Sequence, residues 1–255
     1  MSDSKSDRSA LLIGIDDTDN LQSRGTGYRA RCLGRLLADE GLGRINGISR
    51  HQLLVCDDIP YTSHNSALCL RLEPDAATGL DAVIETCRAF LRRESAPGSD
   101  AGLCVAPLAR AAAPLRGYGR RAQREVLRRR DAEALAQEQG VYLEGLTGDF
   151  GGVIGALAAV GLRAGGADGR FVWVEGIRER TDRRCSIAEL LSETGVDSVE
   201  TLAGAPINDR AQWLNLGPWP RPIARDGRAV LLVEENPDDQ DCHWRVVDRA
   251  VIKGY

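Results

Sequence analysis

The feature that most constrains this sequence is an apolar run near the N-terminus that ends in a cluster of acidic residues. Leu11 to Ile15 is typical of a short buried β-strand. Four polar residues follow at once, Asp16, Asp17, Thr18 and Asp19. The loop Gly25-Thr26-Gly27 comes next, and an amphipathic pattern then predicts a helix over 28–40. A strand, an acidic turn, a glycine loop and a helix are therefore expected in that order.

This order of elements is suited to a metal–phosphate site. Mg²⁺ prefers oxygen ligands and is usually held by one or two carboxylates together with substrate phosphates. Glycines allow the backbone to approach a ligand closely, and a helix N-terminus presents N–H groups to an anion. Three neighbouring aspartates also repel one another, which a bound cation would relieve. The alternative is a solvated turn with an aspartate N-cap.

Composition narrows the class of protein. The chain has 255 residues, 43% of them hydrophobic and 27% charged, which is sufficient for one large or two small globular domains. A formal net charge of −4 argues against a broadly basic nucleic-acid surface but allows a local basic patch. The 7 cysteines form no C-x-x-C pair, and the 3 histidines are too scattered to indicate zinc. Reduced thiols, together with the lack of an apolar run of roughly 18 residues or a signal-peptide core, predict a cytoplasmic protein without a membrane partner.

The first hundred residues predict alternating strands and helices. Residues 1–9 are expected to be a disordered tail. Strands are expected at 10–15, 51–56, 66–72 and 103–106, and helices at 28–40 and 80–93. The resulting order over 10–106 is β-α-β-β-α-β, the split βαβ pattern of ferredoxin-like folds.

A basic segment follows. From Leu115 a single helix is expected to run to about Gln139. It carries seven arginines, Arg116, Arg120, Arg121, Arg124, Arg128, Arg129 and Arg130. They form either a solvated helix face paired with neighbouring acidic residues or a surface for polyphosphate or RNA backbone.

A second glycine-rich helix entry lies further along. Gly151 and Gly152 open the run 153–162, whose alanines and glycines indicate a helix packed closely on its neighbours. The entry is either purely structural or a seat for a phosphate or ribose. Beyond it, we expect strands at 171–177, 229–233 and 243–247, and a short helix at 186–194. Ser186 and Glu189 form a capping box at the start of that helix.

Four motifs resemble one known family. They are Gly14-Ile15-Asp16-Asp17-Thr18-Asp19, the segment 59–67, the Pro-Gly loop at 97–102, and Gly151-Gly152-Val153-Ile154-Gly155-Ala156-Leu157-Ala158-Ala159-Val160-Gly161. In this order they resemble the archaeal isoleucine-tRNA agmatinylcytidine synthetases over roughly residues 11–235. The acidic motif and the Gly-Ala-Leu-Ala-Ala motif together are fairly specific.

The resemblance implies an activity and a domain order. Members of that family use ATP and Mg²⁺ to phosphorylate the C2 oxygen of a tRNA anticodon cytidine, and agmatine then displaces the phosphate. Their kinase-like N-terminal domain is followed by a ferredoxin-like domain, an OB fold and a zinc ribbon. This sequence has no four-ligand cysteine set for such a ribbon. It also has Gly25-Thr26-Gly27-Tyr28-Arg29 where the family has a Cys-Thr-Thr segment.

We therefore predict an α+β fold of two mixed α/β layers, with a kinase-like and a ferredoxin-like domain. Residues 10–165 would form the ATP- and Mg²⁺-binding region and 166–255 a second α+β region. The predicted metal ligands are Asp16, Asp17 and Asp19, which with Thr26 form the catalytic set. The predicted ATP contacts are Thr18, Gly25, Gly27, Arg116, Arg120, Gly151 and Gly152.

Three functions remain open at this point. The first is ATP- and Mg²⁺-dependent phosphoryl transfer to a small-molecule or nucleoside-like acceptor by a kinase or synthetase. The second is modification of a tRNA cytidine together with a partner that captures the tRNA. The third is nucleotide binding without catalysis. The sequence does not name the acceptor or an amine donor, and it leaves the oligomeric state open, with a homodimer as one option.

Overall fold

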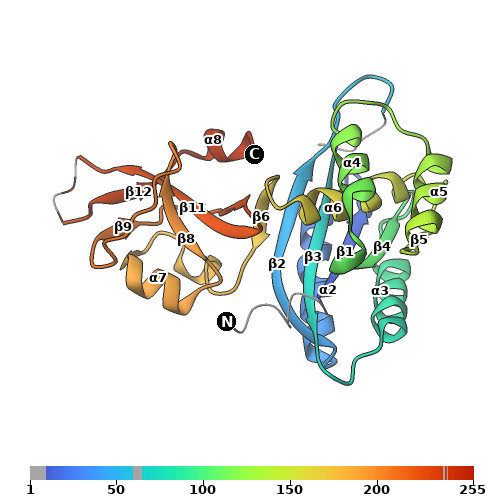
Figure 1. Ribbon diagram of the computed structural model, residues 1–255, viewed down its shortest axis with the longest axis horizontal. Coiled ribbons are helices and arrows are strands. Elements are labelled where there is room, and N and C mark those ends of the chain that lie inside the picture. The colour runs from blue at the N-terminus through green and yellow to red at the C-terminus, as the bar shows by residue number, and fades with distance from the viewer. Residues whose placement is uncertain (1–9, 60–64, 238, 240) are drawn as a thin grey trace. The chain divides into compact units, whose positions relative to one another are not determined.

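The computed structural model describes residues 10–59, 65–237, 239 and 241–255. The chain forms two compact units, unit 1 from Met1 to Gly165 and unit 2 from Gly166 to Tyr255 (Figure 1). The tail expected at 1–9 and most of the motif expected at 59–67 lie outside the described residues. The α+β class expected from the sequence is confirmed.

Unit 1 is built from strands and helices that alternate along the chain. Its strands are β1 (Leu11–Asp16), β2 (Gly43–Gln52), β3 (Ser66–Pro74), β4 (Gly102–Pro107) and β5 (Tyr142–Gly145). Its helices are α2 (Thr26–Asp39), α3 (Leu80–Glu94), α4 (Ala113–Ala122), α5 (Arg129–Gln139) and α6 (Val153–Gly165), with a short 3₁₀ turn at Leu108–Arg110.

The five strands of unit 1 form an antiparallel sheet in the order β5-β4-β1-β3-β2. Strand β1 is central, with Ile15 opposite Leu68 of β3 and Leu103 of β4. The order β4-β1-β3-β2, with helices after β1 and β3, is a split βαβ arrangement. Because β1 is flanked on both sides, its C-terminal end at Asp16 has a fixed position in the sheet.

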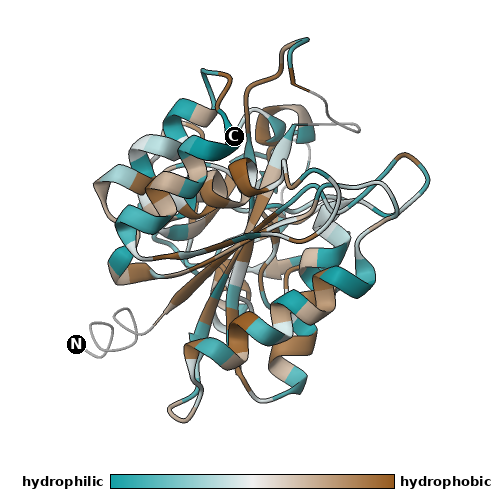
Figure 2. Cartoon of the chain, turned by 90° about the vertical axis from the view of Figure 1, so that its right-hand side faces the viewer, coloured by the Kyte–Doolittle hydropathy of each residue, from teal (hydrophilic) through white to brown (hydrophobic). Residues whose placement is uncertain are grey.

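Alternation along β1 assigns helices to the two faces of this sheet. Leu12 belongs to the buried cluster formed with α4, α5 and α6, and Gly14, two residues on, also faces α6. Ile13 and Ile15 are completely buried on the opposite face, because successive side chains of a strand alternate. Figure 2 shows the largely hydrophobic strands between two groups of helices.

Helix α6 lies unusually close to the sheet because glycines remove side chains from the contact. A Cβ atom at Gly14 would lie 2.0 Å from the carbonyl oxygen of Ala156. A Cβ at Gly102 of β4 would lie 2.1 Å from the carbonyl carbon of Gly152, just before α6. On the side of α6 that packs on α4, a Cβ at Gly161 would lie 2.0 Å from the carbonyl oxygen of Leu115. The close packing expected from the alanines and glycines of this helix is therefore confirmed.

Two expected elements of unit 1 have different bounds. The strand expected at 51–56 is wrong, because β2 ends at Gln52 and residues 53–56 leave the sheet. The strand begins at Gly43, where only glycine is tolerated. Its φ is +140°, and the Cβ of any other residue would lie 2.3 Å from the Glu73 carbonyl oxygen. Its hydrophobic pattern is interrupted by a register shift between Ile45 and Ile48, which hides the strand in the sequence.

The single basic helix expected from Leu115 to Gln139 is also wrong. It is divided into α4 and α5, with residues 123–128 between them. The carbonyl oxygen of Ala122, at the end of α4, accepts a hydrogen bond from the backbone N–H of Leu54 at 3.0 Å. Leu127 then turns into the core, where it is 8% exposed. A tertiary hydrogen bond and a buried leucine therefore end the helix, although the residues between are good helix formers.

Unit 2 consists mainly of short strands. They are β6 (Arg170–Trp173), β7 (Arg184–Ser186), β8 (Ser198–Thr201), β9 (Trp213–Asn215), β10 (Ile223–Arg225), β11 (Arg228–Glu235) and β12 (Trp244–Val246). Its helices are α7 (Ile187–Glu193) and α8 (Arg249–Lys253), with a 3₁₀ turn at Arg178–Arg180. The strands pair in the order β6-β10-β11-β12-β9-β7, and β8 pairs in parallel with β11.

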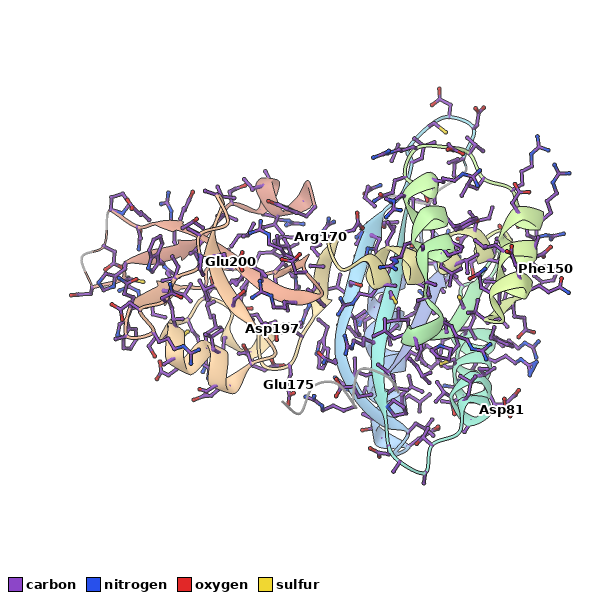
Figure 3. All side chains as sticks on the ribbon, in the orientation of Figure 1. Asp81, Phe150, Arg170, Glu175, Asp197 and Glu200 are labelled. Carbon is purple, nitrogen blue, oxygen red and sulfur yellow. The ribbon has the colours of Figure 1, made fainter. Side chains whose placement is uncertain are left out.

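Two local features stabilise unit 2. The capping box predicted for α7 is confirmed, because the Ser186 hydroxyl accepts from the Glu189 backbone N–H and the Glu189 carboxylate accepts from that of Ser186. Glu200 on β8 is 4% exposed and pairs with Arg225 at 2.6 Å and Arg228 at 3.4 Å (Figure 3). A buried carboxylate needs such partners, since an unpaired buried charge is strongly destabilising.

The cysteines agree with the expectation that their thiols are reduced. All seven cysteines are free thiols, and five of them, Cys69, Cys87, Cys104, Cys185 and Cys242, are buried. Among the described helices, none is both long enough and apolar enough to cross a lipid bilayer.

Candidate functional site

The acidic turn begins where β1 ends. The carboxylate of Asp16 lies against helix α6 at Gly155, where a Cβ atom would come within 1.8 Å of Asp16 Oδ2. Asp17 has a φ of +48°, in the left-handed region that non-glycine residues rarely adopt. Such strain persists only where the surrounding structure enforces it, and it is often found at functional sites.

Asp19 and Thr26 are tied together at the start of α2. Asp19 Oδ1 accepts hydrogen bonds from the backbone N–H of Thr26 at 3.0 Å and from its hydroxyl at 2.5 Å. The hydroxyl of Thr18 donates to Thr26 Oγ1 at 3.0 Å, and both threonines are buried. Asp19 therefore caps α2 in place of Gly25, the N-cap residue, which has no side chain to do so.

Two aspartates from distant loops join the acidic turn. Asp100 Oδ1 accepts from the backbone N–H of Asp149 at 2.7 Å, and Asp149 Oδ1 accepts from that of Gly151 at 2.8 Å. The carbonyl oxygen of Asp100 accepts from the N–H of Gly152 at 2.9 Å. This chain of bonds fastens the loop before β4 to the entry of α6. Neither aspartate is among the ligands predicted from the sequence, although Asp100 lies in the Pro-Gly loop at 97–102 and Asp149 stands two residues before Gly151.

The entry of α6 offers space rather than free donors. The N–H groups of Gly151 and Gly152 are occupied by Asp149 and Asp100. Those of Val153 and Ile154 donate to the carbonyl oxygens of Phe150 and Gly151. Gly151 and Gly152 do line the pocket, but any contact to an anion there would first have to displace these bonds.

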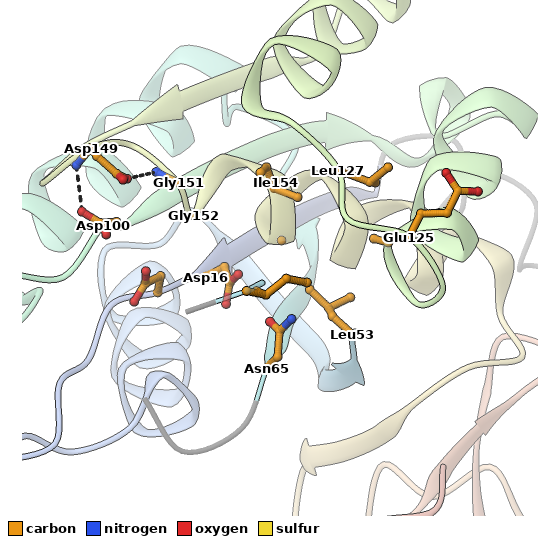
Figure 4. A pocket seen from close by; sticks show the side chains of 14 residues that line it. Asp16, Leu53, Asn65, Asp100, Glu125, Leu127, Asp149, Gly151, Gly152 and Ile154 are labelled. Carbon is orange, nitrogen blue, oxygen red and sulfur yellow. Dashed lines mark hydrogen bonds between the residues drawn. The ribbon is translucent and has the colours of Figure 1, made fainter. Parts of the chain in front are cut away.

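These residues surround one pocket with a volume of about 160 Å³. Its lining consists of Asp16, Asp17, Leu53, Ile59, Asn65, Asp100, Ala122, Glu125, Leu127, Asp149, Gly151, Gly152, Ile154 and Gly155. Figure 4 shows Asp100 and Asp149 on one side of the pocket, Leu53 and Leu127 on the other together with Glu125, and Asp16 between the two sides. The pocket is smaller than the roughly 300–1,000 Å³ that encloses a whole drug-sized ligand. It is suited to one part of a larger ligand, with an acidic end and an apolar end.

Crowding of carboxylates changes their acidity. Burial, reinforced by the charge of Asp17, raises the pKa of Asp16 to about 7. Burial and the charges of Asp100, Asp19 and Asp149 raise the pKa of Asp17 to about 6. Arg50, on β2, opposes the shift at Asp16 only weakly, and its own pKa is lowered by burial. The acidic end therefore lacks a sufficient internal counter-charge near neutral pH, and a bound cation would supply one.

The donor set suits a metal ion that is shared with phosphates. In the described ranges, no three His, Cys, Asp or Glu side chains are grouped closely enough to hold a metal ion by themselves. Asp16 and Asp17 both line the pocket, whereas Asp19 does not. Two carboxylates are what Mg²⁺ typically takes from a protein when substrate phosphates complete its shell.

The remaining predicted site residues lie elsewhere. Gly25 and Gly27 are at the start of α2, where a Cβ on Gly27 would meet nothing within 4 Å, so this loop has open space. Arg116 and Arg120 are exposed on α4 and do not line the pocket. The pocket is reached instead by the segment after α4, through Ala122, Glu125 and Leu127.

The geometry of unit 1 defines an α+β domain with an acidic pocket at the end of its central strand. No family model and no curated protein matches the sequence. Among solved structures, a complex of TiaS with an isoleucine tRNA and ATP is 24% identical with a TM-score of 0.54, over 60% of this chain and 36% of that chain. A tRNA fluorescent labelling enzyme is 25% identical with a TM-score of 0.53 over the same shares.

The particular likeness is thus to TiaS, a tRNA agmatidine synthetase. The apo structure of that enzyme is 22% identical with a TM-score of 0.53, over 60% of this chain and 35% of that chain. The resemblance seen in the motifs is confirmed at the level of the fold. The matched part spans only about a third of the length of these structures.

Proposed function

We propose that this protein is an ATP- and Mg²⁺-dependent phosphoryl-transfer enzyme, related to the agmatidine synthetases, that acts on a nucleoside-like or small-molecule acceptor. The observation that carries the proposal is the convergence of Asp16 and Asp17 with Asp100 and Asp149 in one pocket. The fold it shares with an enzyme crystallised with ATP supports the choice of nucleotide. The free thiols of all seven cysteines support a reducing compartment such as the cytoplasm.

The roles of the residues follow from their positions. Asp16 and Asp17 would hold Mg²⁺, which would supply positive charge to neutralise the charge that develops on the transferring phosphoryl group. Asp100 and Asp149 orient the glycine entry of α6 and keep the acidic end negative. Asp19, Thr18 and Thr26 hold the turn and the start of α2 in place. Gly27, which does not line the pocket, leaves open space at the start of α2 for a phosphate chain that would extend beyond the pocket.

The apolar end of the pocket is where the acceptor would lie. Leu53, Leu127 and Ile154 line it, and an acceptor packed against them would exclude water, which would protect a phosphorylated intermediate from hydrolysis. The acceptor oxygen would then face the acidic end, where the phosphoryl group arrives. A structural relative bound to an ATP analogue and agmatine supports an amine as the group that finally displaces the phosphate.

The test is ATP turnover with Mg²⁺, analysed for ADP and AMP, in the wild type and in Asp16→Asn. Loss of one charge-assisted contact, worth about 1.5–3 kcal/mol, should lower turnover by about 10- to 150-fold. Asp81→Asn, on the exposed start of α3, is the matched control and should leave turnover unchanged. A wild type that neither binds nor consumes ATP would refute the proposal.

A second function, modification of a tRNA cytidine with a partner, is favoured by one surface. Arg116, Arg120, Arg124 and Arg128 are exposed and, within the described chain, their side chains have no ion pair, whereas Arg121 pairs with Glu125 at 3.0 Å. Unpaired arginines are suited to a phosphate backbone. Steeply salt-dependent tRNA binding, weakened by Arg120→Gln with Arg124→Gln, would favour this function.

Nucleotide binding without catalysis is the third function. It is favoured by the hydroxyl of Thr26, which is engaged by Asp19 and Thr18 rather than free to receive a phosphoryl group. ATP binding without any turnover, in the presence of both nucleoside and amine, would favour it.

A further inference from the structure

Asn65 is fixed more firmly than its place in a connecting segment would require. It lies directly before β3, and its backbone carbonyl accepts from the N–H of Leu53 at 2.9 Å and from Gln52 Nε2 at 2.7 Å. Its own side-chain Nδ2 donates to the carbonyl oxygen of Leu54 at 2.6 Å. Because Nδ2 is bound to a carbonyl, the orientation of the amide is determined, and Oδ1 lies on the other side.

The free end of this amide belongs to the pocket. The Asn65 side chain lines the cavity, and Figure 4 shows it between Asp16 and Leu53, where the acidic and apolar ends meet. Within the described ranges, no side chain or backbone group donates to Oδ1. An amide oxygen can only accept, and so can the ionised carboxylates of Asp16 and Asp17 beside it. This wall is therefore complementary to a ligand that brings an N–H donor.

The apolar end restricts the shape of that ligand. Leu53, Leu127 and Ile154 offer flat hydrocarbon contact to a ring. The volume of about 160 Å³ is close to the roughly 150 Å³ of a cavity known to hold one benzene ring. The pocket as a whole therefore has room for a single heterocyclic ring, which would lie against these apolar side chains with its substituent directed toward Asn65.

We propose that Asn65 is the specificity-determining residue of the pocket and selects a nucleobase that carries an exocyclic amino group. The amino group donates to Oδ1, while the ring lies among the leucine and isoleucine side chains. A base without the amino group leaves Oδ1 desolvated and unpaired, which costs far more than the net gain of an ordinary hydrogen bond. This inference deepens the proposed function, because it concerns the acceptor end of the same pocket.

The test uses pairs of nucleosides that differ only in the amino group. Affinities are measured by calorimetry at pH 8.5 with Mg²⁺ for cytidine against 2-pyrimidinone riboside, and for adenosine against purine riboside. In the wild type, loss of the amino group should weaken binding by about 5- to 150-fold in at least one pair. Neutral nucleosides are used because phosphates would interact separately with the acidic end.

Two variants separate recognition from structure. Asn65→Leu and Asn65→Asp both lose the hydrogen bond to Leu54, so any cost to folding is common to them. Asn65→Asp keeps an acceptor oxygen and should keep the preference for the amino base. Asn65→Leu has no acceptor, so its affinity ratio for that pair should fall to about one. Thermal unfolding in both variants checks that unit 1 remains folded.

The nucleoside affinities test the role of Asn65 independently of catalysis. Equal affinities within both wild-type pairs, or no nucleoside binding at all, would overturn it. An unchanged ratio of the two nucleoside affinities in Asn65→Leu would also overturn it. Variants that change only the affinity for Mg²⁺ would overturn it as well, since Asn65 would then be a metal ligand. ATP turnover is measured in the same preparations. An amino preference without turnover supports the inference while refuting the proposed function, and turnover without the preference does the reverse.

Discussion

The contact between Gly155 and Asp16 gives a sharp prediction, because it links helix packing directly to the site. In Gly155→Ala the new Cβ would lie 1.8 Å from Asp16 Oδ2 and 2.6 Å from Asp16 Cγ. Both distances are well below van der Waals contact, so the carboxylate must rotate away or α6 must move. Since α6 is also packed so closely at Gly14 and Gly161 that a Cβ there would lie 2.0 Å from a backbone oxygen, we expect the Asp16 side chain to move.

Two opposing effects decide how much Gly155→Ala changes the stability of unit 1. Alanine is favoured over glycine in a helix by about 1 kcal/mol. Overpacking a tight contact costs about 1–3 kcal/mol. We therefore expect a net loss of up to about 2 kcal/mol in the stability of unit 1. Gly117→Ala on α4 is the matched control: a Cβ there would meet nothing within 4 Å, so only the gain in propensity should appear.

Two probes follow the two units separately. All four tryptophans, Trp173, Trp213, Trp219 and Trp244, lie in unit 2, so their fluorescence reports on that unit, whereas far-UV circular dichroism is dominated by the helices of unit 1. In urea, Gly155→Ala should unfold earlier by circular dichroism than wild type, and Gly117→Ala should unfold later. ATP turnover should fall in Gly155→Ala alone. If Gly155→Ala matches its control in both stability and turnover, Asp16 is not positioned by this contact.

The remaining predictions concern charge and capping. The pKa values of Asp16 and Asp17 in the folded state are about 7 and about 6, above the value near 3.8 in the unfolded state. At a pH between the unfolded and folded values, the folded state therefore binds more protons than the unfolded state. The stability of the metal-free protein should thus fall as pH rises from about 4 to about 7. Asp16→Asn should flatten this fall and be more stable than wild type at pH 8, and Mg²⁺ should stabilise wild type there; a wild type whose unfolding midpoint rises over this range would contradict the raised pKa values. In unit 2, Ser186→Ala removes the N-cap of α7 and should destabilise that unit by about 1 kcal/mol in fluorescence-monitored urea unfolding. Ser192→Ala, within the same helix, is its control, and an equal effect of the two changes would rule out a specific capping contribution.

Much of the fold is encoded locally and could be predicted. The apolar run of β1 is continuous because both faces of that strand are buried, by α6 on one side and by the opposite core on the other. The capping box of α7 lies within four residues, so its two hydrogen bonds depend on nothing distant. The alanines and glycines of α6 likewise indicate close packing before any partner is known. Patterns of this kind need only the period of a helix or strand.

Local patterns fail where a distant segment decides the outcome. The break between α4 and α5 depends on a hydrogen bond from Leu54, far away in the sequence. The start of β2 depends on pairing with Glu73 and Pro74 across a register shift. Neither partner can be identified from the periodicity of the segment itself, because pairing across a sheet is set by the whole strand order.

The acidic site shows the same division. The sequence by itself determined that carboxylates follow a buried strand, and hence that Asp16 and Asp17 stand at the edge of a sheet. Only the tertiary structure decided which other groups meet them. It brought Asp100 and Asp149 to the pocket and assigned Asp19 to the cap of α2. The physical reason is that a ligand set is defined by distances of a few ångströms, and only the packing of α6 on the sheet brings residues separated by more than eighty positions that close.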